Sequence, residues 1–239
     1  MGCMNELNEK TMNELNEKTQ CRRCGTCCRK GGPSLHIEDK ELVDNGKIAL
    51  KNIFTIREGE PVNDNIRGII HTAKSDIIKI KGKNSSWECI FFNNNNCKIY
   101  RQRPIECRSL KCWDTREIEK IYLKGRLTRK DLVSEVKGLW DLVLEHDQRC
   151  SYKKIRIAAD CAKESTDITE AVKEILDIIK YDLSIRSLVK ERGKLDPEIL
   201  DFLFGRPILK TIKMFGYRVQ QKQDRFYLSK WRQPNGQKV

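Results

Sequence analysis

The chain has 239 residues, of which 38% are hydrophobic and 34% charged, and its formal net charge is +13 at pH 7. This length allows one large domain or two small ones with a real core. No apolar run approaches the roughly 20 residues that a membrane-spanning helix needs, so no membrane span is expected. The N-terminus also lacks the apolar stretch of about 7–15 residues that marks a secretory signal. Eleven cysteines in such a chain favour the reducing cytoplasm, where clusters of this kind usually bind metal.

Residues 1–20 are expected to form a disordered tail. The segment 4–11 repeats identically at 12–19, and each copy holds only one Leu and one Met. Such a segment has little apolar surface to bury. Cys3 in this tail is expected to be a solvent-exposed thiol without a role.

Four cysteines fall within eight residues, at Cys21, Cys24, Cys27 and Cys28. The spacing C-x2-C-x2-C is the start of the bacterial iron–sulfur ligand run. Two cysteines separated by two residues can aim both sulfurs at one ion across a tight turn, which Gly25 eases. Neighbouring side chains of an extended segment point to opposite sides, so Cys27 and Cys28 are expected to serve two sites or to leave one thiol spare.

A second group of cysteines lies about sixty residues downstream, at Cys89, Cys97, Cys107 and Cys112. The segment 87–100 places an Asn-rich tip between two short apolar runs, which predicts a hairpin with a cysteine on each arm. All eight cysteines are therefore candidate metal ligands. One division assigns Cys21, Cys24, Cys27 and Cys107 to one site, and Cys28, Cys89, Cys97 and Cys112 to the other if there are two.

Other candidate ligands are less well supported. Cys150 and Cys161 are expected to be buried free thiols, because free cysteine packs like a small hydrophobic residue. His146 precedes Cys150 by four positions, which allows a mixed site with Cys150 or Cys161, but a surface or capping histidine is favoured.

Five arginines lie within or beside the cysteine segments, at Arg22, Arg23, Arg29, Arg103 and Arg108. Four thiolates around a zinc ion, or around an oxidised cubane iron–sulfur cluster, leave the site net negative. These arginines are expected to offset that charge and to help hold the thiolate form.

Residues 21–114 are predicted to form a small, loop-rich module that needs metal to hold it together. A short strand is expected at 35–37, followed by a helical turn from Glu38 to Val43. Runs of β-branched residues predict strands over 51–57 and 76–81, with a turn at 59–65 between them.

Residues 115–239 are predicted to be mainly helical. Thr128 begins a helix as its N-cap, and apolar residues at helical spacing continue to Val143 as one face. A longer helix starts at Asp167 and stops at Gly193. Short helices begin at Asp196 and Arg206, and alternation over 217–228 predicts a C-terminal β-hairpin. The expected fold class is therefore α+β.

The end of the chain is strongly basic, because residues 205–239 carry nine Lys and Arg against Asp224 alone. Such a surface can bind phosphate, nucleic acid or an acidic partner. A solvated face is favoured, since no nucleic-acid-binding fold motif accompanies the charge. The expected partner is a redox or other protein that the sequence does not identify, and nucleic acid is not favoured.

The combined cysteine pattern resembles the YkgJ-type cysteine-cluster family, whose hallmark is the CxxCxxCC zinc- or iron-chelating domain. The matching pieces are Cys21-x2-Cys24-Gly25-x-Cys27-Cys28, then Cys89, Cys97-Lys98-Ile99-Tyr100 and Arg103-Pro104-x2-Cys107-Arg108. The resemblance implies a metal or iron–sulfur protein, commonly labelled an Fe–S oxidoreductase, and does not settle a reaction. Lysine methylases that modify flagellin are similar in their cysteine pattern, which implies an enzymatic alternative.

Three functions are compatible with these observations. The favoured one is a protein that carries an iron–sulfur cluster, preferably 4Fe–4S, with an electron-transfer or redox role. The alternative is a zinc-bound structural or adaptor module whose basic C-terminal part contacts an anionic partner. The third is an enzyme, such as a protein methylase, that uses the metal domain as a scaffold.

Overall fold

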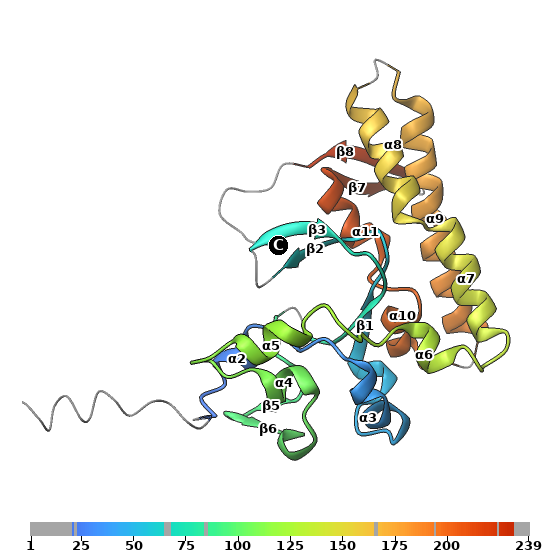
Figure 1. Cartoon of the computed structure of the whole chain (residues 1–239). Helices are drawn as coiled ribbons and strands as arrows, with labels where there is room; N and C mark the ends of the chain where they lie inside the picture. Colours follow the sequence, from blue (N-terminus) through green and yellow to red (C-terminus); the bar gives the residue numbers. More distant parts are fainter. Residues whose placement is uncertain are drawn as a thin grey trace, which may run out of the picture.

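The computed structural model describes residues 21, 23–64, 68–83, 86–164, 167–193, 195–223 and 225–231. Short helices and two-stranded antiparallel sheets occupy the first half of the chain, and longer helices follow before a terminal hairpin, which confirms the predicted α+β class. The tail predicted at 1–20 lies outside the described residues. Figure 1 shows the small elements that carry the cysteines at one end of the molecule and the terminal hairpin at the other.

The cysteine-bearing end is built from short elements joined by loops. They are α2 (Thr26–Arg29), β5 (Phe92–Asn93), β6 (Asn96–Cys97), η3 (Tyr100–Gln102), α4 (Ile105–Ser109) and α5 (Arg116–Ile121). The predicted Asn-tipped hairpin is confirmed: β5 and β6 pair, and Asn94 and Asn95 between them both have positive φ, 45° and 57°. The prediction of a cysteine on each arm is only half right, because Cys97 lies on β6 but Cys89 precedes β5 in an isolated bridge with Gly82. Asparagine tolerates this conformation better than most residues, which explains the tight turn.

Two predicted strands form the central sheet of the molecule. β1 (Ile53–Ile56) pairs antiparallel with β4 (Ile77–Ile80), and the 3-10 turn η2 (Leu50–Asn52) leads into β1. The expected helical turn near Glu38 is also present as η1 (Ile37–Asp39) and α3 (Lys40–Asp44). At 35–37 the structure has isolated bridges at Ser34 and His36 rather than a strand.

The predicted turn at 59–65 is wrong for most of its length. β2 (Pro61–Asp64) is a strand there, and it pairs with β3 (Ile69–Thr72) as a hairpin that projects from the central sheet. Proline is tolerated as the first residue of a strand, because the missing N–H matters least there. The polar composition of the segment concealed its pairing with the apolar Ile69 and Ile70.

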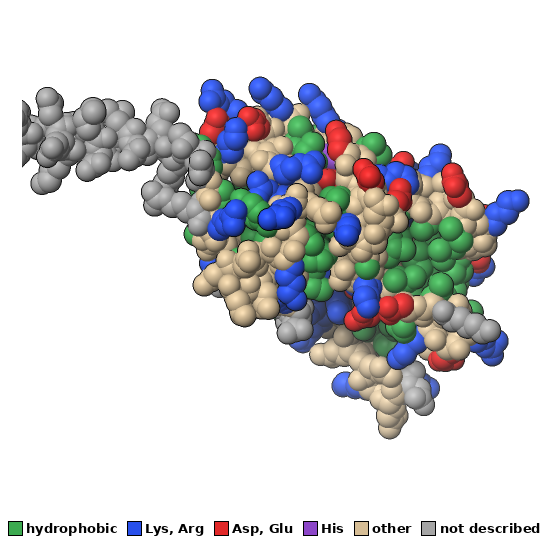
Figure 2. Space-filling model, turned by 90° about the horizontal axis from the view of Figure 1, so that it is seen from below, with side chains coloured by type: hydrophobic (Ala, Val, Ile, Leu, Met, Phe, Trp, Pro, Cys, Tyr) green, Lys and Arg blue, Asp and Glu red, His purple; other side chains and the backbone are tan. Residues whose placement is uncertain are grey.

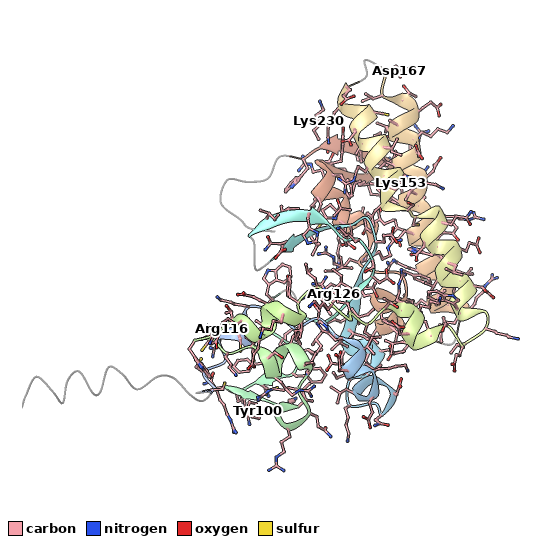
Figure 3. All side chains as sticks on the ribbon, in the orientation of Figure 1. Tyr100, Arg116, Arg126, Lys153, Asp167 and Lys230 are labelled. Carbon is pink, nitrogen blue, oxygen red and sulfur yellow. The ribbon has the colours of Figure 1, made fainter. Side chains whose placement is uncertain are left out.

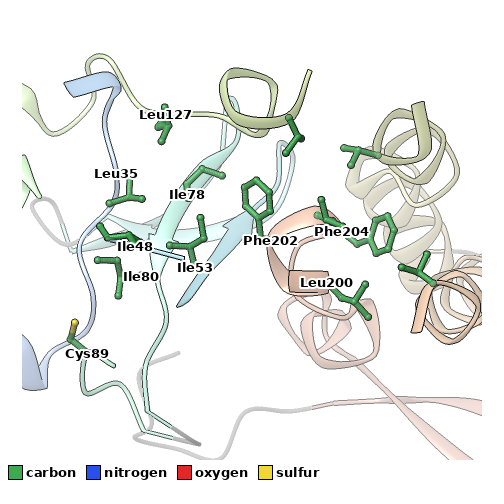
Figure 4. Close-up of a cluster of buried hydrophobic side chains, with 14 of the residues drawn as sticks. Leu35, Ile48, Ile53, Ile78, Ile80, Cys89, Leu127, Leu200, Phe202 and Phe204 are labelled. Atoms are coloured by element: carbon green, nitrogen blue, oxygen red, sulfur yellow. The ribbon is translucent and has the colours of Figure 1, made fainter. Parts of the chain in front are cut away.

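The main hydrophobic core joins the two halves of the chain. Leu35, Ile53 and Ile78 from the first half pack in one cluster with Phe202 and Phe204 from near the C-terminus (Figure 4). Phe202 lies in α10 (Leu200–Leu203) and Phe204 directly follows it, and α10 continues from η4 (Pro197–Ile199), which begins after the cap residue predicted at Asp196. The Thr55 hydroxyl in β1 also donates to the carbonyl of Phe202 (2.6 Å). The predicted module at 21–114 and the helical region thus share a core, while the boundary between them stays a prediction.

The helix predicted from Thr128 to Val143 is two helices. α6 (Arg129–Val133) begins at the predicted cap, where Asp131 accepts hydrogen bonds from the Thr128 backbone and hydroxyl. α7 (Leu139–Arg149) begins only after Gly138, whose φ is 79°. Apolar spacing continues through the break, so periodicity alone could not reveal it.

A second core lies between the long helices and the terminal hairpin. α8 (Tyr152–Glu164) packs against α9 (Thr169–Arg192), which ends at Gly193 as predicted. α11 (Ile208–Thr211) and η5 (Ile212–Phe215) lead to the predicted hairpin of β7 (Tyr217–Lys222) and β8 (Arg225–Lys230). Ile155, Ile179 and Ile212 are completely buried where these elements meet.

A buried arginine links several elements around the main core. Arg129 forms bidentate contacts with Asp76 (2.6 and 2.9 Å) and with Asp147 (2.7 and 3.1 Å), and it donates to the carbonyl of Leu203 (2.8 Å). The planar guanidinium suits this arrangement because its donors form a rigid fork. One side chain therefore links the loop before β4 with α6, α7 and α10.

The surface is rich in basic side chains. Figure 2 shows Lys and Arg spread over the face seen from below, with apolar side chains exposed between them. Within the described residues, no helix is both long enough and apolar enough to cross a membrane.

Candidate metal centre

The first cysteine group is held by a turn that only glycine makes without strain. Gly25 has φ 75° and caps α2, so Cys24 lies before the turn and Cys27 and Cys28 lie within the helix. Cys21, Cys24 and Cys27 are exposed, and Cys28 is half-buried. A Cβ on Gly25 would lie 2.1 Å from the Phe92 ring of β5. This close approach places the cysteine turn directly against the hairpin.

The second group meets the first through the backbone. The Cys89 N–H donates to the carbonyl of Cys28 (2.9 Å), and a bridge to Gly82 holds Cys89 from its other side. Cys97 lies on β6 opposite Phe92, the residue that contacts Gly25. Segments sixty residues apart in the sequence are therefore joined where their cysteines lie.

Cys107 is positioned by the buried polar contacts of its helix, α4. The neighbouring Glu106 carboxylate accepts from the Ser34 N–H (2.7 Å) and lies 3.2 Å from His36 Nε2. At the start of the helix, the Ile105 N–H donates to Asp39 (2.8 Å). These contacts fix α4 against the segment that follows the first cysteine group.

Five cysteines lie close enough together for their sulfurs to interact electrostatically, and the effect is seen at Cys28, Cys89 and Cys107. Burial raises the pKa of Cys107 well above its ordinary value, and Cys89, Cys27, Cys28 and Cys97 raise it further. Burial and then Cys27 raise the pKa of Cys28 to about 12. Without a cation these buried thiols stay protonated at neutral pH, whereas a bound metal would stabilise the thiolates and release their protons.

The remaining three predicted ligands are at the surface. Cys21, Cys24 and Cys112 are exposed, and every cysteine in the described part of the chain is free of disulfide bonds. A hydrogen bond with the Thr26 hydroxyl lowers the pKa of Cys24, with Arg29 adding to this effect. Cys107 lies beside members of both predicted ligand sets, and the assignment of all eight cysteines to one site or two stays a prediction.

Arginines surround the cysteine segments. Arg29 donates to the carbonyl of Cys24 (2.9 Å) and to the side chain of Asn95 (2.6 Å). The guanidinium groups of Arg23 and Arg103 lie 4.2 and 4.1 Å from the ring centroid of Tyr100, which Figure 3 labels at this end of the molecule. Arg22 lies outside the described residues, and the role of all five arginines in offsetting thiolate charge stays a prediction.

A second group of possible ligands lies outside the cysteine module. In the described part of the chain, three ligand-type side-chain atoms come within 4.8 Å of one another at His146, Cys150 and Asp182, whereas no three ligand atoms of the cysteine module form such a group. His146 was expected to be a surface or capping residue, but it is completely buried. The prediction of a buried thiol is confirmed for Cys150 and wrong for Cys161, which is exposed. Asp182 on α9 could not be found from the sequence, because only the fold brings it beside α7.

The contacts of Asp182 indicate a structural network. Its carboxylate accepts from Arg186 Nε (2.9 Å) and from the Ile208 N–H (2.9 Å), and it lies 2.9 Å from His146 Nε2. Burial raises the pKa of Cys150 to about 12, so this thiol is neutral. The arginine and the carboxylate already balance each other's charge, and the site needs no cation for neutrality.

The comparisons with known proteins give one match. A family model described as "CxxCxxCC: Putative zinc- or iron-chelating domain" matches residues 20–174, more than half of the chain and beyond the predicted module boundary at 114. Neither the curated proteins nor the solved structures contain a match to the chain. The matched segment contains all eight predicted cysteines, so metal binding is the property that the match supports. The chain belongs to the CxxCxxCC family of zinc- or iron-chelating domains.

Proposed function

We propose that the cysteine module binds an iron–sulfur cluster, preferably of the 4Fe–4S type, and that the protein has an electron-transfer or redox role in the reducing cytoplasm. The observation that carries this proposal is the group of five interacting cysteines, Cys27, Cys28, Cys89, Cys97 and Cys107, beside the C-x2-C-x2-C run. That run is the first part of a bacterial iron–sulfur ligand pattern.

The residues around the cysteines suit an iron–sulfur cluster, which carries a net negative charge together with its thiolate ligands. Cys27, Cys28, Cys89, Cys97 and Cys107 are the first candidates to supply thiolates, with Cys21, Cys24 and Cys112 as the further candidates. A bound iron–sulfur cluster would supply one-electron chemistry. Arg29, which hydrogen-bonds to the backbone of Cys24, places a cation beside the cysteine turn. The ring of Phe92 packs against Gly25 of that turn.

The exposed cysteines leave one side of the module open. Cys21, Cys24, Cys27 and Cys112 all reach the surface. A redox partner could therefore approach without any opening of the core. Zinc, which takes four thiolates but does no redox chemistry, is the competing interpretation.

Metal analysis separates the two interpretations. The full chain is purified without oxygen, and iron, acid-labile sulfide and zinc are measured alongside the visible absorption spectrum. Iron and sulfide in equal amounts with a broad visible band would support the proposal. A colourless protein that holds one or two zinc ions would reject the redox role.

A pair of matched variants identifies the site. Cys107→Ser removes a thiol from the group of five, and Cys161→Ser removes an exposed thiol on α8, outside the module. We expect the first variant to lose most of the bound metal and the second to keep it. Equal metal content in both variants would exclude Cys107 as a ligand.

A further inference from the structure

The two faces of the β7–β8 hairpin differ sharply in chemistry. The register pairs Arg218 with Ser229, Gln220 with Tyr227 and Lys222 with Arg225. Because alternate side chains of a strand point to the same side, these six share one face. Tyr217, Val219 and Leu228 on the opposite face pack into the second core, so the six-residue face points away from it.

The outward face is cationic and carries an aromatic ring. Arg218, Lys222 and Arg225 are exposed, and Tyr227 is 46% exposed. In the part of the chain that the structure describes, no carboxylate forms an ion pair with these three cations. Arg218 donates to the Ser229 hydroxyl (3.2 Å), an interaction that holds the guanidinium along the strand.

Further cations and a second ring extend this face at its end. The Lys213 ammonium and the Arg218 guanidinium lie 5.1 and 5.6 Å from the ring of Trp231, just after β8. Figure 3 labels Lys230 in this region, far from Tyr100 in the cysteine module. The surface is therefore separate from the candidate metal centre.

We propose that the outward face of the β7–β8 hairpin binds single-stranded nucleic acid. Arg218, Lys222 and Arg225 would contact phosphates, and Tyr227 would stack on a base. Single strands expose bases to such rings, and binding that combines a basic surface with stacking needs no particular sequence. A purely acidic protein segment would use the cations but has no group that requires the exposed tyrosine.

This proposal is independent of the metal in the cysteine module. The measurement is fluorescence anisotropy of a labelled 20-nucleotide oligothymidylate with the full chain as purified, over a range of salt concentrations. We expect saturable binding that weakens with salt, because phosphate contacts release counterions. An absence of binding at low salt would overturn the proposal, whatever metal the protein carries.

The variants test the two components of the face separately. The first variant replaces all three cations: Arg218→Gln, Lys222→Gln and Arg225→Gln. It should weaken binding at least tenfold. It should also reduce the slope of log affinity against log salt concentration by about 2, at roughly 0.7 per phosphate contact. Tyr227→Ala should weaken binding by about fivefold to 150-fold and leave the salt dependence of binding unchanged.

A control triple variant removes the same three units of positive charge from elsewhere on the surface. Lys40→Gln, Lys173→Gln and Lys180→Gln remove exposed cations that are each paired with an acidic neighbour in sequence. We expect this variant to bind like the wild type. Equal weakening by both triple variants would show a dependence on net charge alone and overturn the proposal. Competition by polyglutamate as strong as that by oligothymidylate, with no effect of Tyr227→Ala, would assign the face to acidic polypeptides instead.

Discussion

Gly25 determines the geometry of the first cysteine group through two separate properties. Its φ of 75° is in the left-handed region, and the space beside its Cα is filled by the Phe92 ring. A side chain here would therefore meet both backbone strain and a steric clash. Gly46 has nearly the same φ, 68°, but nothing lies within 4 Å of the position that a Cβ would take there. Comparing substitutions at Gly25 and Gly46 therefore separates backbone strain from the steric clash with Phe92.

Gly25→Ala should destabilise the protein more than Gly46→Ala. The left-handed backbone costs about 1–2 kcal/mol in each variant, and overpacking against Phe92 adds about 1–3 kcal/mol in Gly25→Ala alone. We also expect only Gly25→Ala to lose bound metal, because the turn and the hairpin must separate. The measurements are the free energy of urea unfolding and the metal content. Equal values for the two variants would show that Phe92 does not position the turn.

Asp182 is a buried acidic residue whose titration should affect stability. Burial alone would raise the pKa of its carboxyl group, but the hydrogen bond to His146 and the charge of Arg186 outweigh this and lower it below 3.8. The unfolded chain therefore binds the proton more readily than the folded one. The resulting stabilisation is fully present above the unfolded pKa and is lost as the pH falls through the folded value.

Asp182→Asn should cost about 3–5 kcal/mol at pH 7, because it leaves Arg186 without its buried partner. The difference in stability between wild type and variant should shrink as the pH falls from about 5 to 3. Thermal unfolding of both proteins over this range measures it, and their comparison removes any common effect of acid on the metal. A difference that does not change with pH would show that the carboxylate keeps no lowered pKa.

At the scale of elements, Arg129 links segments that lie far apart in the sequence. Its guanidinium is 3% exposed and contacts Asp76 and Asp147, which come from different elements. Arg149 provides a contrast, since its pair with Glu145 on α7 is exposed on both sides. Both are arginine–carboxylate pairs, and they differ in burial.

Arg129→Met should destabilise the protein by about 3–5 kcal/mol, because two partly buried carboxylates lose the charge of Arg129 and only Asp147 keeps another cation, Arg57. Arg149→Met should change stability by less than about 1 kcal/mol, as is usual for exposed pairs. Arg129→Lys should recover only part of the loss, since an ammonium cannot make both bidentate contacts. Denaturant unfolding of the three variants checks this order. A similar small effect for Arg129 and Arg149 would contradict it.

The elements that could be predicted from the sequence are those with local signals. Thr128 as a cap, Gly193 as a helix stop and the Asn-Asn turn each depend on residues within a few positions. The β2 strand and the break at Gly138 were missed, because one needs a partner strand and the other interrupts an apolar pattern that continues. Cysteine spacing identified the candidate ligands, but only the fold brings Cys107 beside Cys28.

At the scale of the whole molecule, the shared core couples the cysteine module to the helical region. Phe202 of α10 is completely buried and packs with residues of β1 and β4 in the main core, where Cys89 is also found. The two regions therefore do not have separate hydrophobic cores at this junction. Loss of packing in the helical region should therefore also destabilise the metal centre.

Phe202→Ala should lower the free energy of unfolding by about 3–5 kcal/mol. We expect metal release and loss of helical circular dichroism to occur at the same denaturant concentration, and both midpoints to shift together in the variant. Ile157→Ala on α8 is the control, because that side chain is 55% exposed and its loss should change neither midpoint measurably. Metal that stays bound after the helices unfold would contradict this coupling. In that case residues 21–114 would unfold as an independent unit, with the metal rather than the shared core as their main source of stability.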